Sequence, residues 1–222
     1  MIIVDGATAH RAVNPLNAEV AQLLGEEFRV YAYDRRGRGD SGDTAPYAVQ
    51  REVEDLAALI AHAGAPAMVF GWSSGAVLAL EAAAAGLPIT HLALFEPPCV
   101  IDDTRPPLPA DYVRRLEARL AEGRPGEAAE LFLTAAVGLP ADLVAGIRQS
   151  PAWADLEAIA HTLAYDGRLV AATMTGTPLP TGRWDSVTVP VLILYGQGTM
   201  PWLITGVRAL AGLLPTATLR AV

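Results

Sequence analysis

The 222-residue sequence contains one cysteine, no lysine and no long apolar segment. A single cysteine, Cys99, excludes an internal disulfide framework, and we interpret it as a buried, unreactive thiol. No apolar run reaches the roughly 18 residues that a membrane-spanning helix needs. The sequence also does not open with the basic, apolar and small-residue order of a secretory signal. From these absences we expect a cytoplasmic protein with no membrane partner.

All 16 basic residues are arginine, and 24 acidic residues bring the net charge to −8. Such an excess of negative charge disfavours binding to nucleic acid or to anionic membranes. No spacing of histidine, cysteine or carboxylate residues is typical of a metal site. The G-x-G-x-x-G pattern at 37–42 does not open into a helix, so we interpret it as a structural loop and not as a dinucleotide site. We therefore expect a small-molecule substrate, no metal and no cofactor.

Apolar residues make up 52% of the sequence, and the mean hydropathy of +0.30 suits a buried parallel sheet with helices on both faces. Short apolar runs alternate with stretches of helical periodicity. This alternation predicts an α/β fold, with mostly parallel strands joined by right-handed crossovers. The predicted strands are 1–4, 28–33, 67–71, 90–95, 189–195 and 216–222. The predicted helices between them are 14–24, 49–63, 74–85 and 202–213.

The alternation stops between Asp102 and Met174, where the sequence becomes helical, charged and interrupted by prolines. The helical stretches predicted there are 109–122, 126–137, and 141–169 with breaks. A helical insertion between two strands of an α/β sheet indicates a cap over the carboxyl edge of the sheet. We therefore expect an α/β core formed by 1–100 and 175–222, with a helical cap at 101–174, in one compact unit.

The most informative motif is Gly71-Trp72-Ser73-Ser74-Gly75, which joins a predicted strand to a predicted helix. A G-x-S-x-G motif in this context is typical of a nucleophile elbow. The glycines are needed because the chain reverses in a small space, where a side chain would collide with the neighbouring strand or helix. Such a turn holds its serine in a strained conformation at the carboxyl edge of the sheet. Ser73 is therefore the candidate nucleophile; the alternative is a serine that only fits a tight turn.

Several segments together resemble the α/β-hydrolase family, particularly its small bacterial, esterase-like members with a helical cap. Residues 1–7 resemble the family's strand and oxyanion loop, 33–42 its D-x-R-G-x-G-x-S loop, and 94–98 the strand that precedes the cap. In the family, two further strands usually precede the strand at Met1. A segment bearing the catalytic histidine usually follows the last strand. We therefore expect the natural histidine to lie beyond residue 222, or the protein to work without one.

An oxyanion hole is expected around Ser73. The backbone N–H of Ser74 lies at the amino end of the predicted helix, where the helix dipole favours negative charge. By resemblance, the second donor is Ala7, with Thr8 as its neighbour. Trp72 directly precedes the nucleophile, and it either lines the substrate pocket or packs against the cap.

Glu96 is the candidate catalytic acid. The usual place for this residue in the family follows the strand 189–195, but 196–200 contains no carboxylate. Some members of the family carry the acid at the end of the preceding strand, where Glu96 stands. A carboxylate there would orient an imidazole and stabilise its cation. The alternative is a structural glutamate at the hinge of the cap.

The general base has no motif of its own in this sequence. His91 opens a predicted strand and His62 ends a predicted helix, so both are expected away from Ser73. His10 lies just past the expected oxyanion loop, and His161 lies on a predicted cap helix. These two are the possible substitute bases within the chain.

Two main functions remain open on these observations. One is a serine hydrolase that cleaves a small, apolar ester or related acyl compound through a Ser73 acyl-enzyme. The other is a non-catalytic or truncated relative that serves as a binding or scaffold protein, or is a fragment. A weaker third interpretation keeps the fold but changes the chemistry, for example to a cofactor-free haloperoxidase or a lyase. Uncovered sheet edges also lead us to expect a homo-oligomer.

Overall fold

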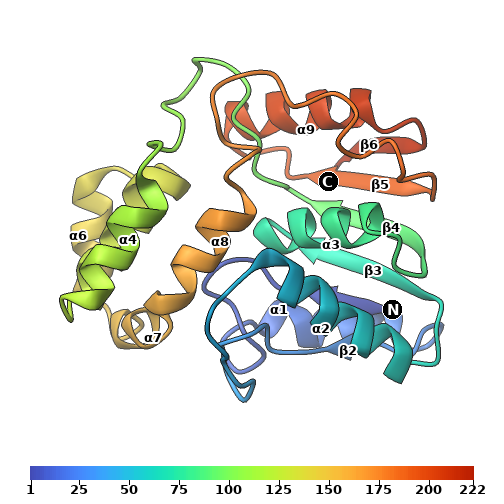
Figure 1. Cartoon of the computed structure of the whole chain (residues 1–222), viewed down its shortest axis with the longest axis horizontal. Helices are drawn as coiled ribbons and strands as arrows, with labels where there is room; N and C mark the ends of the chain where they lie inside the picture. The colour runs from blue at the N-terminus through green and yellow to red at the C-terminus, as the bar shows by residue number, and fades with distance from the viewer.

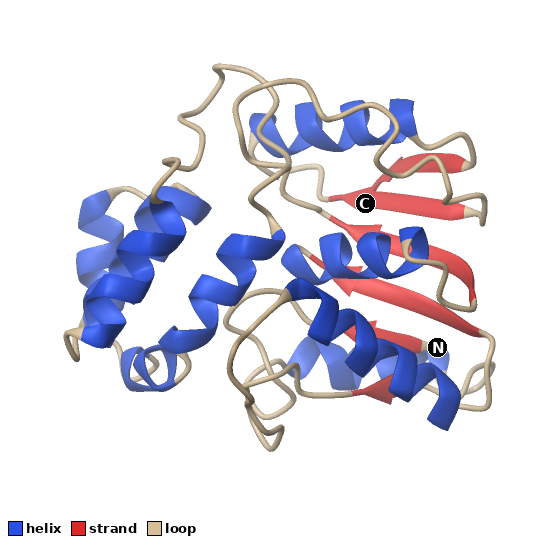
Figure 2. Ribbon diagram, viewed as in Figure 1, coloured by secondary structure: helices blue, strands red, loops and turns tan.

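The computed structural model describes all 222 residues and is built on one six-stranded sheet, in the order β2-β1-β3-β4-β5-β6. Every neighbouring pair of strands is parallel. This confirms the predicted α/β class. The strands are β1 (Ile2–Val4), β2 (Tyr31–Ala32), β3 (Ala67–Trp72), β4 (Ile89–Phe95), β5 (Val191–Tyr195) and β6 (Ala217–Ala221). Figure 2 shows all their carboxyl ends pointing to the same side of the molecule.

Four helices connect the strands: α1 (Pro15–Leu24), α2 (Val49–His62), α3 (Ser74–Ala84) and α9 (Pro201–Leu213). The connection from β1 to β2 runs across the sheet in one direction. The connections through α2, α3 and α9 run in the opposite direction. Right-handed crossovers therefore place α1 on one face and α2, α3 and α9 on the other, as Figure 1 shows. Helix α3 is buried almost throughout, because its small residues, among them Ala76, Ala79 and Ala82, let it pack closely against the sheet.

A second group of helices lies beside the carboxyl edge of the sheet (Figure 1). It consists of α4 (Tyr112–Ala121), α5 (Pro125–Leu131), the π-helix η1 (Phe132–Val137), α6 (Ala141–Arg148), α7 (Trp153–Ala158), the 3-10 turn η2 (Ala160–Thr162) and α8 (Leu163–Leu169). This group buries its own apolar cluster, centred on Leu116 and Leu163. Helix α8 also contacts α2 and α3, so it joins the group to the sheet. The core and cap boundaries remain a prediction.

Two predicted elements differ from those observed. The strand predicted at 28–33 is reduced to Tyr31–Ala32, because it lies at the edge of the sheet and pairs only with β1. The single helix predicted at 126–137 changes at Phe132 from α to π geometry. There the Thr134 hydroxyl donates to the Glu130 carbonyl at 2.8 Å, which competes with the regular backbone pattern.

The sheet has β2 at one edge and β6 at the other. Strand β6 carries two exposed polar residues, Thr218 and Arg220, and a charged edge of this kind limits pairing with another chain. Self-association remains a prediction. None of the helices combines the length and the apolar composition needed to cross a membrane.

Candidate active site

Ser73 occupies a strained turn between β3 and α3. Its backbone has φ 50° and ψ −120°, and a positive φ is rare for a residue with a Cβ atom. The turn is held on both sides, because the Ser73 N–H donates to the Phe95 carbonyl at 2.8 Å and its carbonyl accepts from the Ala76 N–H at 2.9 Å. A conformation of this kind costs about 1–3 kcal/mol and persists only where the surrounding structure enforces it.

The two glycines of the motif are required by close backbone approach. A Cβ atom at Gly71 would lie 2.5 Å from the Ala76 Cα. A Cβ atom at Gly75 would overlap the carbonyl oxygens of Val4 and Asp5. Since these neighbours are backbone atoms, they cannot move aside without displacing β1 or α3. The packing of α3 against the sheet therefore depends on both glycines.

The turn opens into a cavity of about 380 Å³ between the carboxyl edge of the sheet and the second group of helices. Ser73 is exposed on its wall. From the sheet and its loops the lining residues are Ala7, Trp72, Ser73, Ser74, Phe95, Glu96 and Pro98. From 112–174 they are Tyr112, Phe132, Ala136, Val137, Asp166, Gly167, Val170 and Met174, and from the segment entering α9 they are Thr199, Met200, Trp202 and Leu203. No arginine or histidine is among them.

The predicted oxyanion residues lie on the same wall. Ser74 is the first residue of α3, and Ala7 belongs to the loop that follows β1. The neighbouring Gly6 brings this loop against the turn, because a Cβ atom there would lie 3.1 Å from the Ser73 Cβ. Thr8 has φ 63°, which indicates a sharp bend directly after Ala7. The structure thus brings Ser73, Ser74 and Ala7 together.

Glu96 lies at the end of β4 and reaches towards the loop after β5. Its Oε1 accepts a hydrogen bond from the Gly196 N–H at 3.0 Å, and its φ is 48°. Gly196 begins the segment where the family's acid is usual, and that segment contains no carboxylate. The Glu96 carboxylate therefore lies beside the usual position of the acid, although Glu96 itself directly follows β4.

None of the four histidines lines the cavity. The Nδ1 atom of His10 is buried without a hydrogen-bond partner. His161 is half-exposed, lies edge-on to Tyr165 and has its Nε2 3.9 Å from Asp43 Oδ2. His62 ends α2, and His91 lines a separate depression on the sheet. The structure therefore places neither of the possible substitute bases against the Ser73 cavity.

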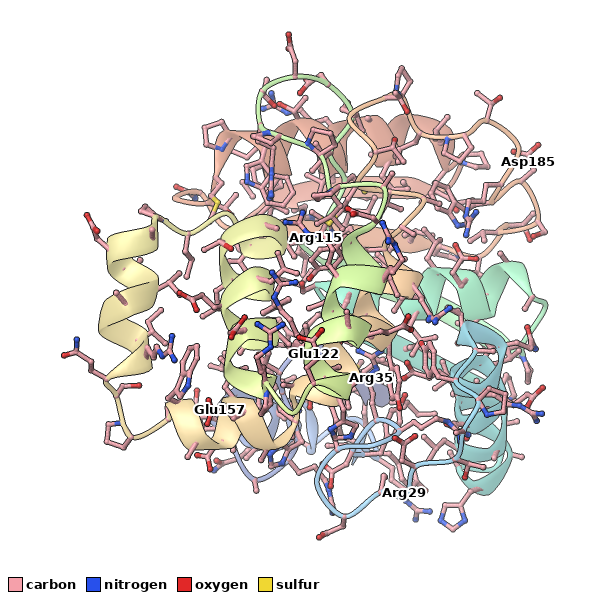
Figure 3. All side chains as sticks on the ribbon, turned by 60° about the vertical axis from the view of Figure 1, so that its left-hand side comes forward. Arg29, Arg35, Arg115, Glu122, Glu157 and Asp185 are labelled. Atoms are coloured by element: carbon pink, nitrogen blue, oxygen red, sulfur yellow. The ribbon has the colours of Figure 1, made fainter.

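A buried charge cluster behind the turn was not predicted. It consists of Arg35, Arg38, Glu52 and Asp166, each at most 3% exposed. Arg35 donates to Glu52 at 2.7 and 2.8 Å and to Asp166 at 2.8 Å, and Arg38 donates to the second Asp166 oxygen. Ser74 Oγ completes the cluster by donating to Asp166 Oδ1 at 2.7 Å. Figure 3 labels Arg35, which is 1% exposed, near the middle of the view, whereas Asp185 lies at the periphery.

The cluster keeps the Asp166 carboxyl ionised. Burial alone raises its pKa, but the guanidinium groups of Arg38 and Arg35 outweigh burial, and the pKa lies below its ordinary value. The two arginines belong to the loop that resembles the family pattern, and this is the one sequence signal that could have singled them out. Asp166 comes from α8, 128 residues after Arg38, and no local pattern singles it out.

Trp72 lines the cavity, with its ring packed between other aromatic side chains. Its ring centroid lies 4.7 Å from Phe70 and 4.9 Å from Phe95. At the opposite side, the Arg105 guanidinium lies 4.5 Å from the Trp202 ring centroid and donates to the Ala136 carbonyl at 3.1 Å. These contacts fix η1 against α9 and give the cavity a mainly aromatic and aliphatic wall. No group of three metal-ligating side chains is placed to hold an ion.

Proteins with similar sequences and structures include several that are named as hydrolases. The sequence model of the alpha/beta hydrolase family matches residues 6–221. An alpha/beta hydrolase from Sphaerobacter thermophilus DSM 20745 has a solved structure that is 50% identical, with a TM-score of 0.89 over 99% of this chain and 83% of its own. The enol-lactonase from Burkholderia xenovorans LB400 shares the fold, with 21% identity and a TM-score of 0.66 over 100% and 81%. Lipase LipV from Mycobacterium tuberculosis is 29% identical over an alignment of 198 residues, which covers 82% of this chain but only 66% of that protein.

Proposed function

Because the chain belongs to the alpha/beta hydrolase family, we propose that it cleaves small, apolar esters or related acyl compounds through an acyl-enzyme on Ser73. The observation that carries the proposal is the strained Ser73 turn, which presents the serine to a largely apolar cavity. A serine held in this way has its hydroxyl in a fixed position relative to a bound acyl group. The likeness to a protein named as a lipase supports acyl cleavage.

The reaction begins when Ser73 Oγ attacks the acyl carbon and a base removes the hydroxyl proton. The carbonyl oxygen becomes an oxyanion, which receives hydrogen bonds from the backbone N–H groups of Ser74 and Ala7. Collapse of this tetrahedral intermediate breaks the ester bond, and the leaving alkoxide takes the proton back from the base. Water then attacks the Ser73 ester by the same steps and releases the carboxylic acid.

Glu96 serves as the acid that orients the base and stabilises its cation. Its Oε1 is fixed by the Gly196 N–H, and the residue lines the same cavity as Ser73. A carboxylate beside an imidazolium stabilises the charge that develops as the serine proton is transferred. The cavity wall itself contains no imidazole, so a test of the chemistry has to supply one.

The cavity wall favours uncharged acyl groups. Its only acidic residues are Glu96 and Asp166, and it contains no basic residue. Asp166 is already paired with Arg35 and Arg38, which leaves no cation for a substrate carboxylate. A buried anion without a partner carries a large desolvation cost. A short aliphatic acyl chain instead replaces water against residues such as Phe132, Val137 and Leu203.

Hydrolysis of ethyl butyrate tests this proposal. The release of butyric acid is measured in the presence of added imidazole. Monoethyl succinate is the matched substrate, because it has the same chain length with a terminal carboxylate. We expect ethyl butyrate to be cleaved with a kcat/KM at least about tenfold higher, the equivalent of ~1.4 kcal/mol. Ser73→Ala should remove both activities. Equal rates for the two esters would contradict the substrate class, and activity in Ser73→Ala would contradict the nucleophile.

A second candidate function is that of a non-catalytic binding protein. The absence of histidine from the cavity wall favours it. In that case butyrate esters would bind and change the fluorescence of Trp72 and Trp202, while no acid would be released even with imidazole. Binding without turnover in the unmodified protein would therefore replace the hydrolase proposal.

A further inference from the structure

We infer that Asp166 is a positioning residue through which helix α8 sets the geometry of the oxyanion hole. The inference rests on the proposed function, because it concerns the N–H groups of Ser74 and Ala7. Asp166 does not touch the attacking serine in any hydrogen bond of the structure. It acts through the residues on either side of the oxyanion position.

One side of the oxyanion hole is held directly. Asp166 Oδ1 accepts a hydrogen bond from Ser74 Oγ at 2.7 Å, and both side chains are buried. Ser74 follows the nucleophile, so its backbone N–H is the donor that depends on the orientation of the first residue of α3. A hydrogen bond to a charged carboxylate is stronger than one between neutral groups, and it fixes Ser74 in one rotamer.

The other side is held through the two arginines. Arg38 donates to Asp166 and also to the carbonyl oxygens of Gly6 and Ala9, at 2.5 and 3.4 Å. Gly6 and Ala9 flank Ala7, the second expected donor. Arg35 donates to Asp166 and to the Asp5 carbonyl at 3.2 Å. A single carboxylate therefore connects both donors of the oxyanion hole through buried contacts.

The charges of the cluster cancel. The cluster therefore acts by holding Ser74 and the loop at 6–9 in place, and not by a net electric field at the oxyanion position. Two guanidinium groups face the carboxylates of Glu52 and Asp166. Arg35 is shared between both carboxylates, but Arg38 has no carboxylate partner other than Asp166. Loss of the Asp166 charge would leave Arg38 without a carboxylate partner, and it would free the loop at 6–9 to shift. A displacement of about 1 Å at a reacting group costs on the order of 100-fold in rate.

The test uses a fluorophosphonate, whose phosphoryl oxygen occupies the oxyanion hole when it reacts with a serine. The first-order rate of inactivation and the concentration for half-saturation are measured separately for Ser73 labelling, with imidazole present. In Asp166→Asn we expect the inactivation rate to fall about 10- to 100-fold while half-saturation changes by less than about twofold. Ser74→Ala removes only the hydroxyl that Asp166 anchors, and should lower the rate in the same way by a smaller factor.

Asp43→Asn is the matched control. Asp43 accepts a hydrogen bond from the Tyr165 hydroxyl at 2.7 Å, so it also links a loop to α8, but it has no hydrogen bond or ion pair with the cluster. This variant should keep the unmodified rate. If Asp166→Asn does not fold, the inactivation rate of Ser74→Ala alone tests the role of Asp166.

The possible outcomes separate the two claims. Unchanged inactivation rates in Asp166→Asn and Ser74→Ala, with an unmodified protein that reacts, would overturn the role of Asp166 and leave the hydrolase proposal standing. A change confined to half-saturation would also overturn it, because Asp166 would then only shape the cavity. No reaction of the unmodified protein, with imidazole present, would remove the proposed function and this inference together.

Discussion

Glu96 at the end of β4 accepts a hydrogen bond from the Gly196 N–H at 3.0 Å, and this contact joins the ends of two neighbouring strands. It places a carboxylate beside the loop after β5, which has none of its own. A Cβ atom at Gly196 would make only an ordinary van der Waals contact with Glu96 Oε1, at 3.4 Å. Under the proposed function, this fixed carboxylate is the group that orients the imidazolium.

Replacement of Glu96 by glutamine should remove the negative charge and keep the hydrogen bond to the Gly196 N–H. In Glu96→Gln the side-chain amide oxygen can still accept from the Gly196 N–H, so the unfolding midpoint should stay within about 2 °C. The imidazole-dependent rate of Ser73 labelling should fall about tenfold, the equivalent of one charge-assisted hydrogen bond of ~1.4 kcal/mol. An unchanged rate would assign Glu96 a structural role only.

The strain at Ser73 predicts an unusual difference between two inactive variants. Ser73→Gly removes the Cβ atom that makes a φ of 50° costly, whereas Ser73→Ala keeps it. Relief of about 1–3 kcal/mol of strain, less about 0.5–1 kcal/mol for the added freedom of glycine when unfolded, leaves Ser73→Gly more stable by about 1 kcal/mol. Urea unfolding of both variants measures this difference. A Ser73→Gly variant that is less stable than Ser73→Ala by about 0.5–1 kcal/mol would mean that the turn is unstrained.

The close approach at Gly75 predicts that the elbow tolerates no larger residue. In Gly75→Ala, the new methyl group would overlap two carbonyl oxygens of β1 and its loop. Overpacking against backbone should cost about 1–3 kcal/mol and lower the thermal midpoint by at least about 3 °C. Gly146→Ala is the control, because its Cβ would meet no atom within 4 Å. A similar midpoint in both variants would contradict the packing described here.

Cys99 should be unreactive in the folded protein. Burial raises the pKa of its thiol to about 12, so almost no thiolate is present at about pH 8. We expect no reaction with a disulfide reagent such as dithionitrobenzoate until urea unfolds the chain, and one thiol per chain afterwards. Rapid reaction without denaturant would show that the Cys99 region opens.

Acid should weaken the cluster around Asp166. Its pKa is lower in the folded protein than in the unfolded chain, so its contribution to stability is complete above about pH 4 and is lost as the pH falls through the lower, folded value. Asp166→Asn should therefore be less stable by about 3 kcal/mol or more at about pH 7, and the gap should narrow below about pH 4. Urea unfolding of both proteins at about pH 7 and below about pH 4 measures this difference in stability. An equal difference at neutral and acidic pH would contradict a lowered pKa of Asp166 in the folded protein.

Local sequence signals were sufficient for most of the fold. The strand, glycine and small-residue pattern around Ser73 specifies both the turn and the close packing of α3, and these constraints all lie within a short stretch of chain. Periodicity likewise gave the crossover helices to within about a residue of their observed ends. The edge strand β2 was overestimated because its length depends on the partner strand, not on its own residues.

The contacts that complete the candidate site are long-range and were not readable in advance. Asp166 belongs to a short helix with no distinctive motif, and it meets Ser74 from 92 residues away. The π-helix η1, which brings Phe132 and Val137 to the cavity, is similarly held by Arg105, whose guanidinium binds carbonyl groups 30 and 31 residues further on. Pairings of this kind follow from the packing of the second helical group and not from the sequence around each residue.

Under the proposed function, Ser73 is the nucleophile, the N–H groups of Ser74 and Ala7 are the oxyanion donors, and added imidazole acts as the base. The most direct measurement is fluorophosphonate labelling with and without imidazole, with the modified residue located by peptide mass spectrometry. We predict slow labelling of Ser73 alone, which accelerates as imidazole is added and is absent from Ser73→Ala. No labelling at any imidazole concentration, or labelling at another residue, would contradict the account.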